Sequence, residues 1–302
     1  MTLSPTAEAI RKIVRGKVLE REQLAKHTSF RIGGPALALV YPLDVEDAVS
    51  VIEAARSLGT RVIVLGHGTN VLFPDEGIDA VIIKTTMMDG MKTSGGQVWA
   101  QAGVSLSKIL EDAMRRGMSG AEFMAGIPGS LGGAVAMNAG TRAGDMASVV
   151  SQVTVIESSA GPRVTHLDAR QAGFRYRGSR ILDEGMIVTD ATMEFSLGEA
   201  SEIKQRVDEA LESRRRTQPT RLPSAGSVFK NPPGQAAGRL IEEAGLKGIS
   251  RGGAQVSPVH ANFIVNTGGA TAVDVLALVE EIRLRVKELT GITLETEIKI
   301  VR

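Results

Sequence analysis

Residues 125–140 read AGIPGSLGGAVAMNAG and contain five glycines. Glycine has no Cβ, so a segment of this composition lets the main chain approach a ligand closely. Ser130 adds a hydroxyl group, and residues 133–136 could open a helix whose first turn faces an anion. The segment therefore predicts an anion-binding loop, with tight packing of a helix as the structural alternative.

A second glycine turn, GHGTN at residues 66–70, follows an apolar run that predicts a strand. It does not fit a Rossmann dinucleotide turn, because Val71 stands where a third glycine is needed and Pro74 follows in place of a helix. The main-chain amides of a tight turn can still bind an anion. This turn is thus either a second ligand loop or a simple connection between two strands.

Hydrophobic periodicity predicts an α+β protein with three successive units. Helices are expected at 44–59, 105–117, 201–216, 234–245 and 271–291. Strands are expected at 36–43, 61–66, 79–84, 98–103, 151–158, 186–197, 261–266 and 292–301. Asp44 and Ser105 are good N-cap residues, and Gly59 and Gly291 are typical helix ends.

Composition excludes several classes of protein. The 302 residues carry 35 basic and 34 acidic side chains, a net charge of +1, and only 3% aromatic residues, which does not fit a nucleic-acid binder. Cysteine is absent, so disulfides, thiolate catalysis and iron–sulfur clusters are excluded. The four histidines are far apart in the sequence, and we expect no metal site.

The chain also shows no sign of membrane targeting. No apolar run reaches the roughly 18 residues that a membrane helix needs. The first residues include Glu8, Arg11, Lys12 and Arg15 and lack the apolar core of a secretory signal. We expect a cytoplasmic protein with no membrane span and no nucleic-acid partner.

Seven motifs occur in an order that resembles one enzyme family. They are HTSFRIGGPA (27–36), GHGTNVL (66–72), AGIPGSLGGAVAMNAG (125–140), FRYRGS (174–179), PSAGSVFKNP (223–232), AGLKG (244–248) and LETEI (294–298). Together they resemble the UDP-N-acetylenolpyruvoylglucosamine reductases, flavoenzymes of peptidoglycan precursor synthesis. The resemblance extends over nearly the whole chain.

The resemblance implies a two-lobed FAD-binding domain of the vanillyl-alcohol-oxidase type, followed by an α+β substrate-binding domain. The expected divisions are an N-terminal helical segment at 1–26, an FAD-binding domain at 27–198 with lobes of about 27–85 and 86–198, and a substrate domain at 199–302. Arg177 and Ser227 are only 50 positions apart. This spacing leaves little room for the tyrosine-bearing loop of the long class, so the chain resembles the short class.

The resemblance also implies the chemistry. NADPH would reduce noncovalently bound FAD, and the enolpyruvyl group of the nucleotide-sugar substrate would then be reduced to a lactyl ether, giving UDP-N-acetylmuramate. Arg177 matches the family's active-site arginine, Ser227 its proton donor and Glu297 its active-site glutamate. Strand alternation alone cannot choose between Glu295 and Glu297; the resemblance selects Glu297.

Further residues are expected to bind the cofactor or the substrate. For FAD they are Gly66, His67, Gly68, Thr69, Asn70, Val71, Pro128, Gly129, Ser130, Gly132, Gly133, Ala134, Asn138 and Ile187. For the substrate they are Lys230, Asn231, Arg214, His260 and Asn262. Which of residues 214–217 would meet the diphosphate stays open, and a capped loop is an equal alternative for His260 and Asn262.

Two other functions remain possible. One is a flavin oxidase of the same fold acting on a small hydroxylated substrate, and the other is a flavin or nucleotide-sugar binding protein without turnover. A proton donor at Ser227 argues against both, because binding alone needs no acid. We expect the protein to be a monomer.

Overall fold

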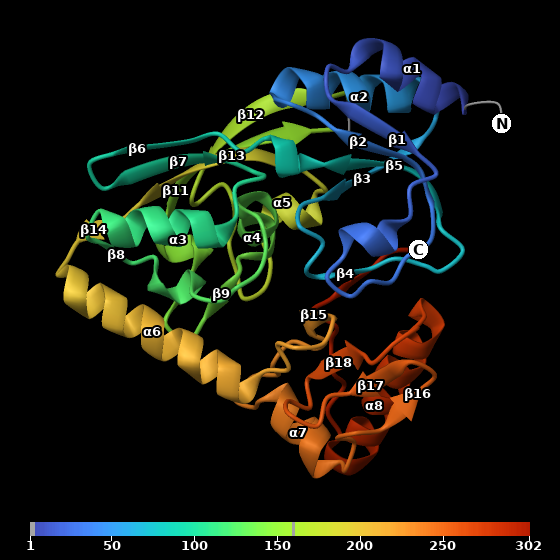
Figure 1. The fold of residues 1–302 in the computed structure, drawn as a ribbon, viewed down its shortest axis with the longest axis vertical. Coiled ribbons are helices and arrows are strands. Elements are labelled where there is room, and N and C mark those ends of the chain that lie inside the picture. The colour runs from blue at the N-terminus through green and yellow to red at the C-terminus, as the bar shows by residue number, and fades with distance from the viewer. Residues whose placement is uncertain (1–3, 159–160) are drawn as a thin grey trace. The chain divides into compact units, whose positions relative to one another are not determined.

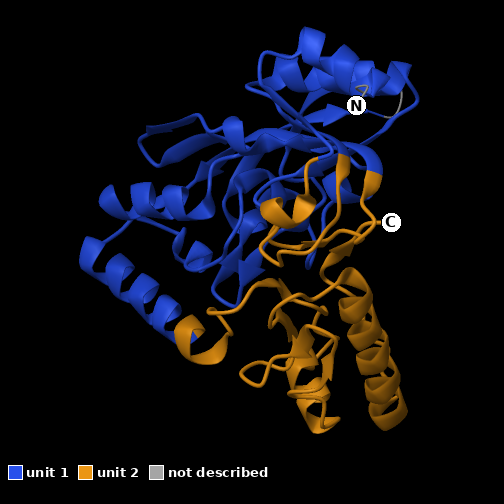
Figure 2. Cartoon of the chain, turned by 45° about the vertical axis from the view of Figure 1, so that its right-hand side comes forward, with its two compact units in different colours: residues 1–21, 37–67, 79–213 blue, residues 22–36, 68–78, 214–302 orange. Residues whose placement is uncertain are grey.

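The computed structural model describes residues 4–158 and 161–302; the first three residues of the expected N-terminal segment and residues 159–160 lie outside this description. The chain forms two compact units (Figure 2). The first contains residues up to 21, 37–67 and 79–213, and the second contains residues 22–36, 68–78 and 214–302. Each unit is therefore assembled from three separate stretches of sequence.

Two helices cover the first sheet of unit 1, α1 (Pro5–Ile13) and α2 (Val45–Ser57) (Figure 1). The sheet has the order β1 (Lys17–Glu20), β2 (Ala36–Tyr41), β5 (Ile78–Lys84) and β3 (Arg61–Leu65). Strands β3 and β5 are parallel, whereas β1 and β2 are antiparallel. The strand–helix–strand–strand order expected from the sequence is confirmed, and β1 is an additional edge strand.

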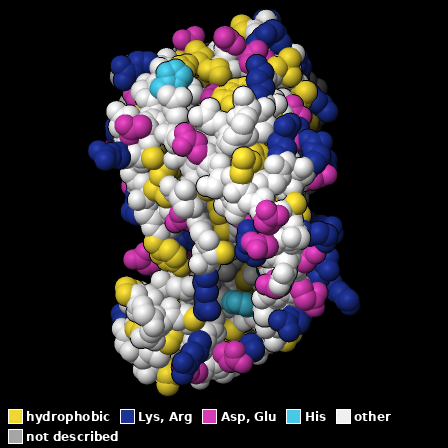
Figure 3. Space-filling view, turned by 90° about the vertical axis from the view of Figure 1, so that its left-hand side faces the viewer, with side chains coloured by type: hydrophobic (Ala, Val, Ile, Leu, Met, Phe, Trp, Pro, Cys, Tyr) yellow, Lys and Arg dark blue, Asp and Glu magenta, His cyan; other side chains and the backbone are white. Residues whose placement is uncertain are grey.

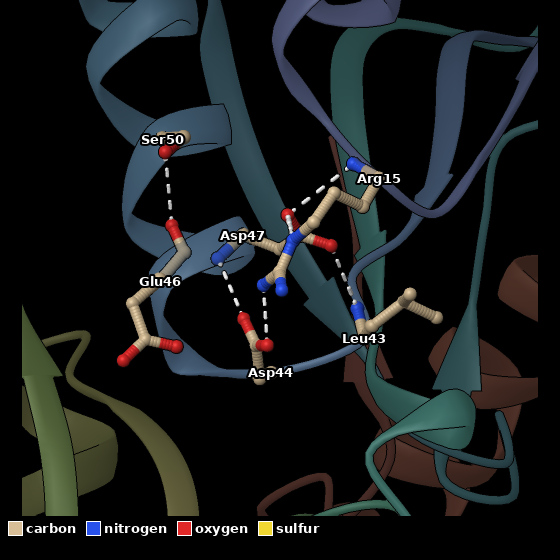
Figure 4. A network of polar contacts seen from close by, with 6 residues as sticks. All are labelled: Arg15, Leu43, Asp44, Glu46, Asp47 and Ser50. Carbon is tan, nitrogen blue, oxygen red and sulfur yellow. Dashed lines mark hydrogen bonds and ion pairs between the residues drawn. The ribbon is translucent and has the colours of Figure 1, made fainter.

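Acidic side chains fix the start of α2 (Figure 4). The Asp44 carboxylate accepts a hydrogen bond from Asp47 N at 3.0 Å, as an N-cap should. Asp47 is itself only 3% exposed and accepts from Leu43 N at 3.1 Å and from Arg15 Nε at 3.0 Å. Arg15 also pairs with Asp44. Two carboxylates thus join the turn before α2 to Arg15, two residues beyond the end of α1.

A five-stranded antiparallel sheet forms the other part of unit 1 (Figure 1). Its order is β12 (Arg163–Asp168), β11 (Val150–Glu157), β13 (Ile187–Glu194), β7 (Gln97–Gln101) and β6 (Met91–Ser94). The helices of this part are α3 (Leu106–Arg115), α4 (Leu131–Met137), α5 (Arg180–Asp183) and α6 (Ala200–Thr217), although α6 passes into unit 2 at Arg214. Ser105 caps α3 as expected, since its side chain accepts from Lys108 N.

Short elements complete unit 1. Four two-residue strands form two small pairs, β8 (Met118–Ser119) with β14 (Ser196–Leu197) and β9 (Gly140–Thr141) with β10 (Gly144–Asp145). Three single turns of 3₁₀ helix are η2 (Thr85–Met87), η3 (Glu122–Met124) and η4 (Met146–Ser148). The strand expected at 186–197 is thus divided into β13 and β14, which pair with different partners.

Unit 2 is built around an antiparallel sheet and one long helix. The sheet has the order β15 (Ser224–Ser227), β18 (Phe263–Asn266), β17 (Ala254–Val256) and β16 (Ser250–Arg251). Its other elements are η1 (Leu24–His27), α7 (Ala237–Glu243) and α8 (Ala272–Thr290). Helix α8 ends at Gly291 in the left-handed conformation, φ 73°, as expected.

The N-terminal stretches of unit 2 contribute to its hydrophobic core. Phe30, Ile32 and Leu72 pack in one cluster with buried residues of β18 and α8. Strand β4 (Val71–Leu72) pairs in parallel with β19 (Lys299–Ile300). Phe30 is fully buried, so these stretches are integral to the unit.

The strand expected at 292–301 is shorter than the sequence suggests. Only Lys299–Ile300 forms a ladder, and one isolated bridge joins Thr296 to Phe229. The alternation of burial is still present, with Leu294 and Ile298 buried and Glu295 exposed. One side of the segment is apolar because it packs into the core. The main chain forms only separate hydrogen bonds with neighbouring segments and no continuous ladder.

Surface charge and helix character agree with the composition. Basic and acidic side chains are interspersed on the face drawn in Figure 3. Within the described ranges, no helix is both long and apolar enough to cross a membrane. Over the same residues, no three His, Asp or Glu side chains are grouped as metal ligands would be.

We expect Asp44→Ala to destabilise the protein by about 0.5–2 kcal/mol, because an orphan amide of α2 loses its acceptor. The thermal midpoint should then fall by about 2–4 °C for each kcal/mol. The control is Glu53→Ala on the exposed middle of the same helix, which should stay within about 0.5 kcal/mol of the parent. Equal midpoints for the two variants would contradict the cap.

Candidate functional site

The turn after β3 lies over a buried lysine. Lys84, the last residue of β5, donates from Nζ to the carbonyl oxygen of Gly66 at 3.0 Å. Burial lowers the pKa of Lys84 to about 8. Burial, and then the Lys84 charge, also lower the pKa of His67 below its usual value. His67 is therefore neutral at physiological pH, and Lys84 is the buried cation beside the turn.

The glycine-rich segment forms a second turn that leads into α4. Ser130 precedes the helix and is 2% exposed, yet its Oγ has no hydrogen-bond partner among the described residues. The amides of Leu131 and Gly132 donate to Val104 O and Ala102 O, so these first-turn donors are used by the fold. The available groups of the turn are thus the Ser130 hydroxyl and the surface beside Gly133.

The two turns approach each other within unit 1. A Cβ placed on Gly66 would lie 2.1 Å from Ser130 Oγ, and the His67 ring lies against the main chain of Gly129. A Cβ on Gly133 would meet only Ser130 Oγ, at 4.0 Å, and would otherwise stand in open space. An orphan buried hydroxyl, an open glycine surface and a nearby buried cation fit an anionic group such as a diphosphate.

The rest of the 66–71 turn belongs to unit 2. Gly68 has φ 70°, and a Cβ there would come within 2.2 Å of His27 O, so this position requires glycine. Asn70 donates from Nδ2 to Glu297 O at 3.2 Å. Val71 pairs with Lys299 in the parallel β4–β19 ladder. Residues 68–71 are therefore tied to the segment that contains Glu297.

Arg177 lies in a tight turn that α4 holds in place. Its own φ is 53°, the left-handed region that bulky residues seldom adopt. Nη2 of Arg177 donates to Gly140 O at 2.8 Å. Asn138, which ends α4 with φ 45°, donates from Nδ2 to Arg175 O at 3.1 Å. The glycine-rich segment thus positions the arginine as well as forming its own turn.

Ser227 and Glu297 are brought together in unit 2. Glu297 N donates to Val228 O at 2.8 Å, so the two candidates lie on neighbouring main-chain segments. Among the described residues, none forms a hydrogen bond with Ser227 Oγ, and the side chain is half-buried. Glu297 is half-buried, whereas the Glu295 side chain is 76% exposed and pairs with Lys230 Nζ at 3.3 Å. Burial therefore distinguishes the two glutamates that alternation could not.

An asparagine fixes the segment that follows Ser227. Asn262 is 4% exposed; its Oδ1 accepts from Phe229 N at 2.9 Å and its Nδ2 donates to Phe229 O at 2.8 Å. His260 Nδ1 accepts from Asn262 N at 3.2 Å, and burial followed by Lys247 lowers the pKa of His260. These contacts correspond to the capped-loop alternative for the two residues.

The other expected binding residues are distributed over both units. Asn231 Oδ1 accepts from Ala237 N at 2.9 Å at the start of α7. Arg214 is half-buried, whereas residues 215–217 are exposed. Ile187 begins β13 and is 6% exposed in the hydrophobic cluster beneath α1 and α2. Contacts of these residues with a ligand stay predictions.

The residues expected from the sequence to bind a ligand do not include Lys84. It ends the apolar run of β5, and a lysine in that place ordinarily reaches solvent. Strand alternation was the available signal, because Lys84 shares a face with the fully buried Ala80 and Ile82.

The fold and the two turns place the chain among the FAD-binding flavoproteins. Residues 36–165 match the FAD binding domain family. The solved structure of wild-type Phl p 4.0202, a glucose dehydrogenase, shares the fold with a TM-score of 0.51 at 14% identity, over 65% of this chain and 45% of that one. FAD is accordingly the cofactor of this protein.

Residues 218–301 match the C-terminal domain family of UDP-N-acetylenolpyruvoylglucosamine reductase. Relatives of that name from Heliobacterium modesticaldum and Symbiobacterium thermophilum are 43% and 42% identical, over 95% and 99% of this chain and 91% and 97% of theirs. The crystal structure of the Thermus caldophilus reductase has a TM-score of 0.80 at 37% identity and covers 96% of this chain and 100% of that one. The chain belongs to the UDP-N-acetylenolpyruvoylglucosamine reductase family, which confirms the resemblance and the fold class expected from the sequence.

We expect Gly133→Val to fold normally and to lose FAD, because its side chain enters the open space beside Ser130 rather than the protein core. Flavin absorbance after gel filtration and the thermal midpoint of the apoprotein measure the two effects. Gly132→Val is the contrast, because a Cβ there would lie 2.8 Å from Ala102 Cβ and should destabilise the fold itself. Parental flavin content in Gly133→Val would contradict the anion-binding site formed by Gly66, Ser130 and Gly133, which is called the cradle below.

Proposed function

We propose that this protein catalyses the NADPH-dependent reduction of the enolpyruvyl group of UDP-N-acetylglucosamine enolpyruvate, giving UDP-N-acetylmuramate for peptidoglycan synthesis. The observation that carries the proposal lies in the family's C-terminal domain, where the hydrogen bond from Glu297 N to Val228 O sets the half-buried Ser227 and Glu297 on neighbouring main-chain segments. A binding protein would not need a proton donor there.

The proposed FAD site uses both glycine turns. In unit 1 it comprises Gly66, His67, Pro128, Gly129, Ser130, Gly132, Gly133 and Ala134, with Asn138 behind them and Ile187 toward the adenine. Unit 2 contains the further residues that are expected to bind FAD, namely Gly68, Thr69, Asn70 and Val71. When bound, FAD supplies the transfer of a hydride from NADPH to C3 of the enol ether. The absence of cysteine removes one tether, which fits noncovalent binding.

Three side chains would complete the reaction. Arg177 is permanently charged and offers a fork of donors to the substrate carboxylate, where negative charge develops. Ser227 would deliver the proton to C2, so that C3 gains a hydride and C2 a proton across the former double bond. Glu297 would lie beside this hydroxyl, where a carboxylate can orient it.

The substrate would be held by residues around the Ser227 segment. Lys230, Asn231 and Arg214 would face the nucleotide diphosphate, and His260 and Asn262 would hold the loop. We further propose that residues 27–198 form the FAD-binding part and residues 199–302 the substrate-binding part. Because the substrate and NADPH are both charged and do not cross membranes unaided, the site of action would be the cytoplasm.

A coupled assay tests the proposal directly. Purified protein should oxidise NADPH only when the enolpyruvyl nucleotide sugar is present, with one product formed for each NADPH consumed. Substrate-independent formation of peroxide would favour a flavin oxidase instead. Light scattering after gel filtration tests the expected monomer.

We expect Ser227→Ala to bind FAD and to be reduced by NADPH at nearly the parental rate, because that half-reaction needs no proton at C2. Reoxidation by the enolpyruvyl substrate should slow by about 10²–10⁴-fold, the usual reach of general acid catalysis. Anaerobic stopped-flow measures each half-reaction separately.

The size and place of this loss separate a proton donor from a structural hydroxyl. A lost neutral hydrogen bond explains only roughly tenfold. Ser227→Cys should recover part of the rate, because a thiol can also release a proton. Equal slowing of both half-reactions in Ser227→Ala would make the serine structural.

We expect Glu297→Gln to slow reoxidation by about 10²-fold or more, because the amide cannot accept a hydrogen bond with the strength of a carboxylate. Glu295→Gln is the matched control on the same segment, since its side chain is 76% exposed and paired with Lys230. That control should stay within a few-fold of the parent. A larger effect for Glu295→Gln than for Glu297→Gln would reverse the assignment.

A further inference from the structure

Lys84 is a buried cation that the catalytic scheme does not use. Its residue is 8% exposed at the end of β5, and its ammonium has three donor hydrogens. Among the described residues, Gly66 O is its only hydrogen-bond acceptor, and no carboxylate pairs with it. A buried charge without a counter-charge is costly, so a fold keeps one where something else compensates it.

The surroundings of Lys84 point toward a missing anion. The Gly66 carbonyl accepts from Lys84 on one side of the turn, while the Gly66 α-carbon faces Ser130 Oγ. Ser130 Oγ is a second buried polar atom of this region, and it has no hydrogen-bond partner among the described residues. Two under-satisfied donors, one charged and one neutral, therefore flank the same glycine.

We propose that Lys84 is a positioning residue for the diphosphate of FAD, whose negative charge compensates the lysine from the other side of the Gly66 turn. This inference rests on the cradle of Gly66, Ser130 and Gly133 proposed above. It assigns to the cradle a buried positive charge that glycine turns alone do not provide. Lys84 also donates a hydrogen bond to the Gly66 carbonyl oxygen. It therefore fixes the conformation of the turn and places a positive charge beside it.

Protonation of Lys84 gives the proposal a pH signature. Burial lowers the pKa of the free lysine to about 8, and a bound diphosphate raises it again. FAD affinity should therefore be constant below about pH 8 and decline as the pH rises toward about 10, because the apoprotein loses the proton that the complex requires. His67 is the titratable group facing Lys84 from the turn; its pKa is lowered, so it is neutral throughout this range. Gly129 and Ser130, on the neighbouring turn, do not ionise.

The test uses apoprotein prepared from the holoenzyme and titrated with FAD by fluorescence quenching. Lys84→Met should weaken FAD binding by about 10–100-fold at neutral pH, the loss expected for one charge-assisted hydrogen bond. It should also abolish the decline above about pH 8. Lys84→Arg should keep most of the affinity and show no decline, because arginine stays charged.

Stability of the apoprotein separates this role from a purely structural one. The thermal midpoint of apo Lys84→Met should equal or exceed that of the parent, since an uncompensated buried charge has been removed. Lys108→Met is the matched control, an exposed lysine that also donates to a carbonyl, that of Asp89 at 3.4 Å. Its FAD affinity and pH profile should match the parent.

The outcomes distinguish this inference from the cradle itself. The role of Lys84 would be overturned if Lys84→Met bound FAD within about threefold of the parent while Gly133→Val bound it weakly. The cradle would still be supported by that result. Normal affinity in both variants would overturn the cradle. If Lys84→Met does not fold, the parent's pH profile decides, because a flat profile from about pH 7 to about pH 10 contradicts the proposal.

Discussion

The close approach of two main-chain turns at Gly66 is the constraint on which the site of unit 1 depends. There is no room for a side chain at Gly66, because a Cβ would lie 2.1 Å from Ser130 Oγ. The hydrogen bond from Lys84 to Gly66 O holds the 66–67 turn. The 128–130 turn is held by the hydrogen bonds that the first residues of α4 donate to Ala102 O and Val104 O. The orphan hydroxyl, the open surface of Gly133 and the buried charge are gathered at one place by this single contact.

In unit 2, side-chain amides hold the main chain of the candidate site in place. Asn262 holds both main-chain groups of Phe229, and Asn70 holds the carbonyl of Glu297. Each amide satisfies main-chain groups that scattered strand pairing would leave unpaired, which is costly in a buried segment. The main chain around Ser227 is therefore held by side-chain amides as well as by the irregular pairing of β15 with β18. A rigid segment can hold a hydroxyl toward a substrate without a hydrogen bond that would occupy it.

Local signals in the sequence predicted local structure well. The caps at Asp44 and Ser105 and the left-handed end at Gly291 are where the sequence places them, because capping depends on neighbouring residues alone. Seven ordered motifs were enough to identify the family and its cofactor. Strand alternation could indicate that Lys84 is buried, but its hydrogen bond to Gly66 O depends on a turn that follows a different strand. The short ladder at 299–300 likewise depends on β4, more than two hundred residues away. Which ligand atoms each expected residue meets remains a prediction.

The interleaved construction of unit 2 has a consequence for synthesis on the ribosome. Phe30, Ile32 and Leu72 belong to a core whose other members come from the C-terminal third of the chain. A nascent chain exposes these apolar side chains until that third has been translated, and chains fold their N-terminal parts first. The stretches 22–36 and 68–78 are therefore translated well before the C-terminal residues that complete their core. Apolar surface that stays exposed in a partly folded chain favours aggregation, so completing unit 2 removes this hazard only at the end of synthesis.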